Sequence, residues 1–99
     1  MLFGEALDFA KMGYPICRKG WNGKNLFVFM QVPSIVPFEM IARMQSVPQR
    51  VKEIVIKRDR GLEYSNQMAI VDQANNVKGW APSVSDTLAD DWEIYEEGA

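Results

Sequence analysis

Histidine is absent from this 99-residue chain, and cysteine occurs only once, as Cys17. A single chain therefore cannot assemble a Ser-His-Asp or Cys-His nucleophile system, and it lacks the usual ligands of a zinc site. An intrachain disulfide is impossible, so Cys17 is expected to be a small core residue in a reducing compartment. These absences favour a binding protein over an enzyme, with no catalytic residue, metal or cofactor predicted.

Long apolar runs and an excess of basic residues are also missing. No run approaches the ~20 apolar residues that cross a membrane, and Glu5 and Asp8 make the N-terminus unlike a signal sequence. The net charge of -2 and the pI of about 5.0 argue against a broad nucleic-acid surface. We expect a cytoplasmic protein that has neither a membrane nor a long nucleic acid as its partner.

The composition is that of an ordinary globular protein, with 47% hydrophobic and 24% charged residues. Neither internal repeats nor low-complexity segments interrupt it. A chain of this length is expected to form a single binding domain over residues 1–99, near the size at which partners often complete a core.

The hydrophobic pattern predicts an α+β fold: a small antiparallel sheet with an N-terminal helix and short helices in a central insertion. Helical spacing of apolar residues predicts the first helix over residues 3–12, ending at Gly13. Short helices are expected after Pro37 and Pro48, although residues 54–56 would also suit a strand. A helical turn is predicted at residues 84–89, and strands at residues 14–19, 26–32, 64–72, 77–82 and 91–95.

The strand predicted at residues 26–32 is apolar on both faces. A single antiparallel layer would leave one of those faces wet, so helices, another sheet or another subunit must cover it. We therefore expect a homo-oligomer.

The segment at residues 18–24 concentrates chemistry that suits an anionic, base-containing ligand. Cations contact phosphates, an indole face stacks on a base, and a carboxamide reads a base or ribose edge. Glycine permits close backbone approach, and Asn22-Gly23 also predicts a tight hairpin turn. The alternative is a hairpin with a solvated basic tip and a half-buried Trp21. The candidate ligand contacts here are Arg18, Trp21, Asn22, Gly23 and Lys24.

A second motif, at residues 79–92, adds Trp80, Ser83 and Asp86 to the candidate ligand contacts. Ser-x-x-Asp is also a capping box that satisfies free amides at a helix start, and the two interpretations are compatible. Trp92, inside a predicted strand, is expected to be structural and buried.

Together, the Arg18 to Lys24 run and the Trp80 to Trp92 run resemble the small phage and prophage domain family that includes the second Thoeris anti-defence protein. The resemblance is nearly end to end and is weakest over residues 33–61. The chain departs from the family pattern in two places. Relatives often carry Ser-Gln-x-Asp where this chain has Ser83-Val84-Ser85-Asp86, and many carry Arg-Pro where it has Ser65-Asn66.

The resemblance implies a sponge for an immune signal in the cytoplasm of a bacterial host cell. Such proteins capture a cyclic nucleotide signal, glycocyclic ADP-ribose, hold it without cleaving it, and so silence anti-phage defence. Some relatives also capture cyclic dinucleotides in a separate pocket. The resemblance further implies a homotetramer with pockets at subunit contacts. Trp21 is expected to stack on the ligand base from the tip of the first hairpin, which should contribute less to the core than the strands do.

Two other functions fit the residues. One is a phage protein-interaction or structural module whose tryptophans pack between subunits and which ignores nucleotides. The other is a small nucleotide hydrolase in which Asp86, Asp90 and Asp91 hold magnesium, although adjacent carboxylates near a helix end are more often solvated.

Overall fold

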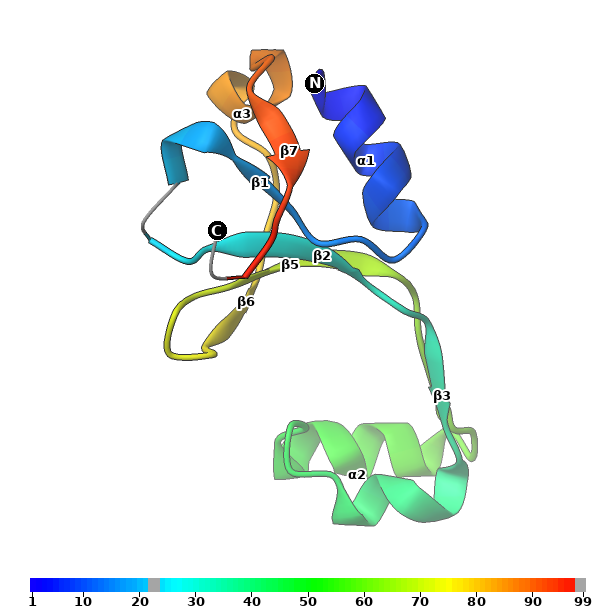
Figure 1. Ribbon diagram of the computed structural model, residues 1–99. Coiled ribbons are helices and arrows are strands. Elements are labelled where there is room, and N and C mark those ends of the chain that lie inside the picture. Colours follow the sequence, from blue (N-terminus) through cyan, green and yellow to red (C-terminus); the bar gives the residue numbers. More distant parts are fainter. Residues whose placement is uncertain (22–23, 98–99) are drawn as a thin grey trace. The chain divides into compact units, whose positions relative to one another are not determined.

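The computed structural model describes residues 1–21 and 24–97, and the chain separates into two compact units. Unit 1 combines Met1–Gln31 with Gln67–Ala99, and unit 2 is Val32–Asn66. Both units contain helices and antiparallel strands, which confirms the predicted α+β class (Figure 1). The expected single binding domain stays a prediction.

Unit 1 is built on a five-stranded antiparallel sheet with the order β6-β5-β2-β1-β7. The predicted hairpin is present because β1 pairs antiparallel with β2, with Ile16 opposite Val28. The strands are β1 (Ile16–Arg18), β2 (Phe27–Gln31), β5 (Gln67–Val71), β6 (Val77–Gly79) and β7 (Trp92–Ile94).

Helix α1 (Phe3–Lys11) packs against β1, β2 and β7 of this sheet. Its buried positions are Ala6 and Ala10, four residues apart and therefore on one face of the helix. Gly13 follows with a φ of 102°, the left-handed conformation that glycine adopts without strain at a helix end. The predicted N-terminal helix is confirmed, with its buried stripe facing the core.

The core of unit 1 lies between α1 and the sheet. Its fully buried members include Ile16, Val28 and Trp92, from β1, β2 and β7. Cys17 is also buried, as expected, and burial together with the charge of Glu93 raises the pKa of its thiol to about 11. The thiol is therefore protonated near neutral pH and is a poor nucleophile.

Strand β2 is buried or half-buried along its whole length. Val28 is fully buried, and Phe27, Phe29 and Met30 are half-buried. Phe27 packs on Tyr95 with ring centroids 5.0 Å apart. Within unit 1, α1 and neighbouring side chains thus cover part of both faces, and the expected subunit interface on this strand remains a prediction.

Unit 2 contains a two-stranded antiparallel ribbon and two helices. The ribbon pairs β3 (Ser34–Val36) with β4 (Leu62–Tyr64). A 3-10 helix, η2 (Phe38–Arg43), and helix α2 (Gln49–Lys57) directly follow Pro37 and Pro48, as predicted. The strand considered for residues 54–56 is wrong, because these residues lie in α2.

The ribbon of unit 2 exposes two errors in the sequence-based assignment. The continuous strand predicted at residues 64–72 is wrong, since β4 ends at Tyr64 and β5 begins at Gln67 in a different sheet. Strand β3 was not predicted at all. β3 and β4 contain three residues each, which is too few to establish a period-2 pattern.

Unit 2 leaves and rejoins unit 1 at neighbouring positions. Gln31, the last residue of β2, lies opposite Gln67, the first residue of β5. The Gln67 amide Nε2 also donates a hydrogen bond to Gln31 Oε1 at 3.0 Å.

Helix α3 (Val84–Leu88) occupies the predicted helical turn, and β6 and β7 are shorter than predicted. In the part of the chain that the structure describes, no helix is long and apolar enough to cross a membrane.

Candidate functional site

Three tryptophans meet in unit 1 and form the aromatic part of the candidate site. Trp92 is 1% exposed and lies at the centre. The rings of Trp21 and Trp80 lie 5.5 and 6.0 Å from it, at interplanar angles of 78° and 76°. Trp21 and Trp80 also contact each other at 6.4 Å. These are edge-to-face contacts, and they leave Trp21 and Trp80 half-buried.

Trp21 is placed differently from the sequence-based expectation. It ends the 3-10 helix η1 (Lys19–Trp21) in the connection between β1 and β2, as expected, but it packs against the hydrophobic core, so this tip contributes more to the core than expected. The reason is tertiary: the chain turns after β1 and brings the indole edge-on to buried Trp92. Its contact with a ligand base stays a prediction, now to be made by the exposed part of the ring.

The start of α3 confirms the predicted capping box. Ser83 Oγ accepts a hydrogen bond from the Asp86 amide at 3.0 Å, and Asp86 Oδ2 accepts one from the Ser83 amide at 3.0 Å. The carbonyl of Asp86 accepts a bond from Trp92 Nε1 at 2.8 Å. The cap therefore fixes both the helix start and the central indole.

Arg18 lies between two carboxylates. Its Nη1 is 3.0 Å from Asp86 Oδ1, and its Nε is 2.9 Å from Asp91 Oδ1. Nη1 also approaches Ser85 Oγ at 3.4 Å. These contacts join β1, α3 and the residue before β7, and we call Arg18, Asp86 and Asp91 the Arg18 clamp.

The clamp shifts the ionisation of all three groups. Hydrogen bonds to Asp91 and then to Asp86 raise the pKa of Arg18. The hydrogen bond from Arg18 holds the pKa of Asp91 below its ordinary value. Burial acts to raise the pKa of Asp86, but bonds from Ser83 and Arg18 outweigh it and the net pKa is lowered. The clamp is thus one cation between two carboxylates that remain ionised near neutral pH.

Lys19 and Lys24 flank Trp21 and are exposed. The Lys24 amide donates a hydrogen bond to the Trp21 carbonyl at 3.0 Å, which keeps the two residues adjacent. Asn22 and Gly23, both predicted ligand contacts, lie outside the described residues together with the turn predicted there.

The structure thus brings five predicted site residues together in unit 1: Arg18, Trp21, Trp80, Ser83 and Asp86. Sequence reasoning missed Asp91 as the second partner of Arg18. No local sequence signal marks this contact, because it arises from the pairing of β1 with β7, which sets Arg18 opposite Trp92 and so beside the preceding carboxylate.

The hydrolase hypothesis finds little support in this geometry. Asp86 and Asp91 both face the guanidinium of Arg18, which occupies the place a cation would take. Over residues 1–21 and 24–97, no group of three or more Asp, Glu, Cys or His side chains could hold a metal ion.

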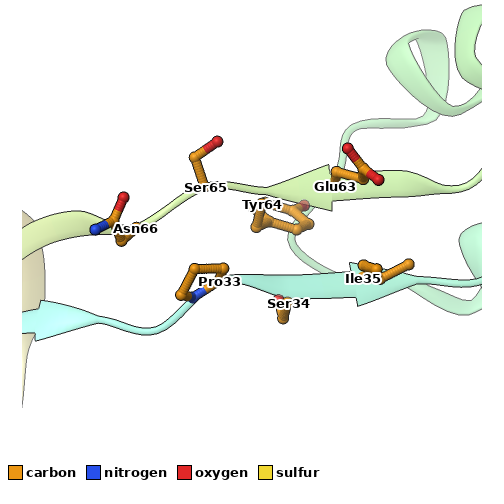
Figure 2. Close-up of a pocket in the computed structure, with 7 residues that line it drawn as sticks. All are labelled: Pro33, Ser34, Ile35, Glu63, Tyr64, Ser65 and Asn66. Carbon is orange, nitrogen blue, oxygen red and sulfur yellow. The ribbon is translucent and has the colours of Figure 1, made fainter.

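A separate cavity of about 540 Å³ lies in unit 2, beside the β3-β4 ribbon (Figure 2). This volume falls in the range of small-molecule pockets, and the Tyr64 ring, the Ser34 and Ser65 hydroxyls and the Asn66 amide could contact a ligand. Its only charged lining residue is Glu63, which would repel a phosphate. The cavity therefore suits an uncharged group better than an anion. The remaining lining residues are Pro33 and Ile35.

The fold and the site define a small α+β domain whose candidate site is made of tryptophan rings, flanking lysines and a closed ion-pair network. The sequence profile of the Thoeris anti-defense 2-like domain matches residues 1–95. Thoeris anti-defense 2 of Bacillus phage SP01 is 33% identical over 94 residues, which cover 95% of this chain and 93% of the relative. The chain belongs to the Thoeris anti-defense 2-like family.

Proposed function

We propose that this protein binds and sequesters a nucleotide immune signal, glycocyclic ADP-ribose, without cleaving it, and thereby inhibits bacterial anti-phage defence. The observation that carries the proposal is the family match over residues 1–95, supported by a relative named for anti-defence. The match spans both structural units, so the proposal applies to the chain as a whole.

The chemistry of unit 1 supports nucleotide binding. The half-buried rings of Trp21 and Trp80 offer aromatic surface for a base, and stacking on an aromatic side chain contributes about 1–3 kcal/mol per base. Lys19 and Lys24, which are exposed and close to Trp21 in the chain, provide positive charge. The absence of histidine from the sequence fits capture without cleavage.

The proposal extends to the assembly and its surroundings. We expect a homotetramer that acts in the cytoplasm of the bacterial host cell, with ligand pockets at subunit contacts. Cyclic dinucleotides are the second ligand class, to be held in a separate pocket other than the cavity of unit 2, whose Glu63 would repel their phosphates. Light scattering at micromolar concentration measures the assembly, and a monomer would count against pockets built from two subunits.

One experiment distinguishes capture of the ligand from its cleavage. The protein is incubated with glycocyclic ADP-ribose, the free ligand is removed by filtration, and the retained fraction is heated and analysed by mass spectrometry. We expect depletion of the filtrate and release of ligand with unchanged mass. Ligand of altered mass would refute sequestration, and an undepleted filtrate would remove this ligand; protein denatured before incubation is the control.

A protein-interaction or structural module is the second candidate, and exposed apolar side chains in unit 2 favour it. Val32, Ile35 and Ile54 are 75%, 73% and 53% exposed. A nucleotide panel read by thermal shift discriminates, because a ligand at about 100 times its Kd stabilises the native state by ~2.7 kcal/mol. A module indifferent to nucleotides shows no shift across the panel.

A further inference from the structure

The Arg18 clamp carries an inference that rests on the proposed function and changes the role of a predicted ligand contact. We propose that Arg18 is a positioning residue that fixes the tryptophan site, and that the ligand's phosphates are contacted by Lys19 and Lys24 instead.

The electrostatics of the clamp oppose a direct phosphate contact at Arg18. Both Asp86 and Asp91 lie at hydrogen-bond distance from its guanidinium, at 3.0 and 2.9 Å. The local charge of the trio is negative, so an arriving phosphate would meet two carboxylates as well as one cation. Like charges at such distances repel, most strongly where water is partly excluded.

Both oxygens of the Asp86 carboxylate already accept hydrogen bonds within the protein. One carboxylate oxygen accepts from Arg18, the other accepts from the Ser83 amide, and its backbone carbonyl accepts from the Trp92 indole. A ribose hydroxyl at this carboxylate would have to share oxygens that already have donors. The geometry assigns Asp86 to holding α3 and Trp92 in place.

The clamp joins the segments that carry the three indole rings. Arg18 directly precedes η1, which ends at Trp21, and Asp91 directly precedes Trp92. Asp86 lies in the helix that follows Trp80. Losing the guanidinium fork would therefore loosen the spacing of the rings, and a stacking site depends on that spacing.

Contact with the ligand's phosphates is therefore assigned to Lys19 and Lys24, the other cations close to Trp21 in the chain. Among the described residues, the ion pairs found are those of Arg18, and Lys19 and Lys24, two and three positions from Trp21 in the chain, are exposed. A lysine is a compact charge on a flexible stem, so it can reach a phosphate without a preset fork.

The test uses the full-length protein and glycocyclic ADP-ribose, with calorimetric Kd values at low and high salt beside a melting curve without ligand. Lys19→Gln and Lys24→Gln should each weaken binding about tenfold to a hundredfold, the range for one charge-assisted hydrogen bond. They should also flatten the salt dependence and leave Tm unchanged. Lys11→Gln, which changes an exposed lysine at the end of α1, is the matched control. It should leave the Kd, its salt dependence and Tm unchanged.

Arg18→Gln should lower Tm while the salt dependence of any remaining binding stays that of the parent. Asp91→Asn should also lower Tm, and the double variant should melt no lower than Arg18→Gln alone, because both changes remove the same contact. Arg18→Lys should restore little, since it lacks the fork.

Two results would overturn the proposal: a flattened salt dependence with unchanged Tm in Arg18→Gln, or tighter binding in Asp91→Asn, which frees half of the guanidinium. Asp91→Asn keeps the ion pair between Arg18 and Asp86, so it remains a test of the proposal if Arg18→Gln does not fold. If the parent protein binds no nucleotide, the proposed function fails, and with it the lysine assignment. The melting temperatures of the single and double variants would still show whether the clamp stabilises the folded protein.

Discussion

Units 1 and 2 differ in the size of their buried cores. Unit 1 encloses a core that includes Ile16, Val28 and Trp92, whereas the described fully buried residue of unit 2 is Ile41, at 0% exposure. Unit 2 nevertheless carries exposed apolar side chains on both its ribbon and α2. A two-stranded ribbon is marginal on its own, so unit 2 relies on a small buried core and unit 1 on a larger one. Precise placement of side chains, which a ligand site needs, is therefore expected in unit 1.

The largest effect should come from removing the centre of the unit 1 core. Trp92→Ala should lower the free energy of unfolding by about 3 to 5 kcal/mol, because the buried ring and its bond to the Asp86 carbonyl are both lost. Urea unfolding followed by circular dichroism measures it. Trp92→Phe keeps an aromatic ring and should cost less; a loss below about 1 kcal/mol in Trp92→Ala would contradict the central place of this ring.

Ile41→Ala tests the small core of unit 2. Deleting this buried side chain should cost about 2 to 4 kcal/mol, and the loss should be confined to unit 2 because Ile41 packs within it. Hydrogen exchange should show faster exchange of amides in η2 and α2 and unchanged protection in unit 1. Ile54→Ala, at an exposed position of α2, is the control; a uniform loss of protection would mean that the two units unfold together.

Gly61→Ala should disturb the ribbon of unit 2. A Cβ at this position would collide with the Val36 carbonyl oxygen, a backbone atom that cannot rotate away. Overpacking of this kind costs about 1 to 3 kcal/mol. Gly79→Ala in β6 meets no atom within 4 Å and is the matched control in unit 1. Equal melting temperatures for the two variants would refute the close approach.

The clamp should make unit 1 sensitive to acid. The pKa values of Asp86 and Asp91 lie below their ordinary value of 3.8, so their ionised forms stabilise the folded state. This contribution is fully present above about pH 4 to 5 and is lost as the pH falls through the lowered pKa values. Melting curves from pH 7 to pH 2.5 should show a steeper loss for the parent than for Arg18→Gln. Parallel curves would contradict the clamp.

Local sequence patterns predicted the parts of the fold that local interactions determine. The spacing of Ala6 and Ala10 indicated α1, and Ser83 with Asp86 indicated the cap of α3. The partners of Arg18 could not be read in this way, because Asp91 is 73 positions away and becomes its neighbour only when β1 pairs with β7. The same holds for Trp21, whose burial depends on Trp92.

The pairing of Gln31 with Gln67 has a consequence for how this chain can change. Unit 1 holds the two ends of unit 2 together by its own strand pairing, so to unit 1 the whole intervening segment is the loop of a hairpin. The entropy of closing a loop grows slowly, by about 0.6 kcal/mol for each doubling of its length. The segment can therefore lengthen, shorten or be exchanged between relatives at little thermodynamic cost to unit 1. Diversity can accumulate in unit 2 while the tryptophan site is retained.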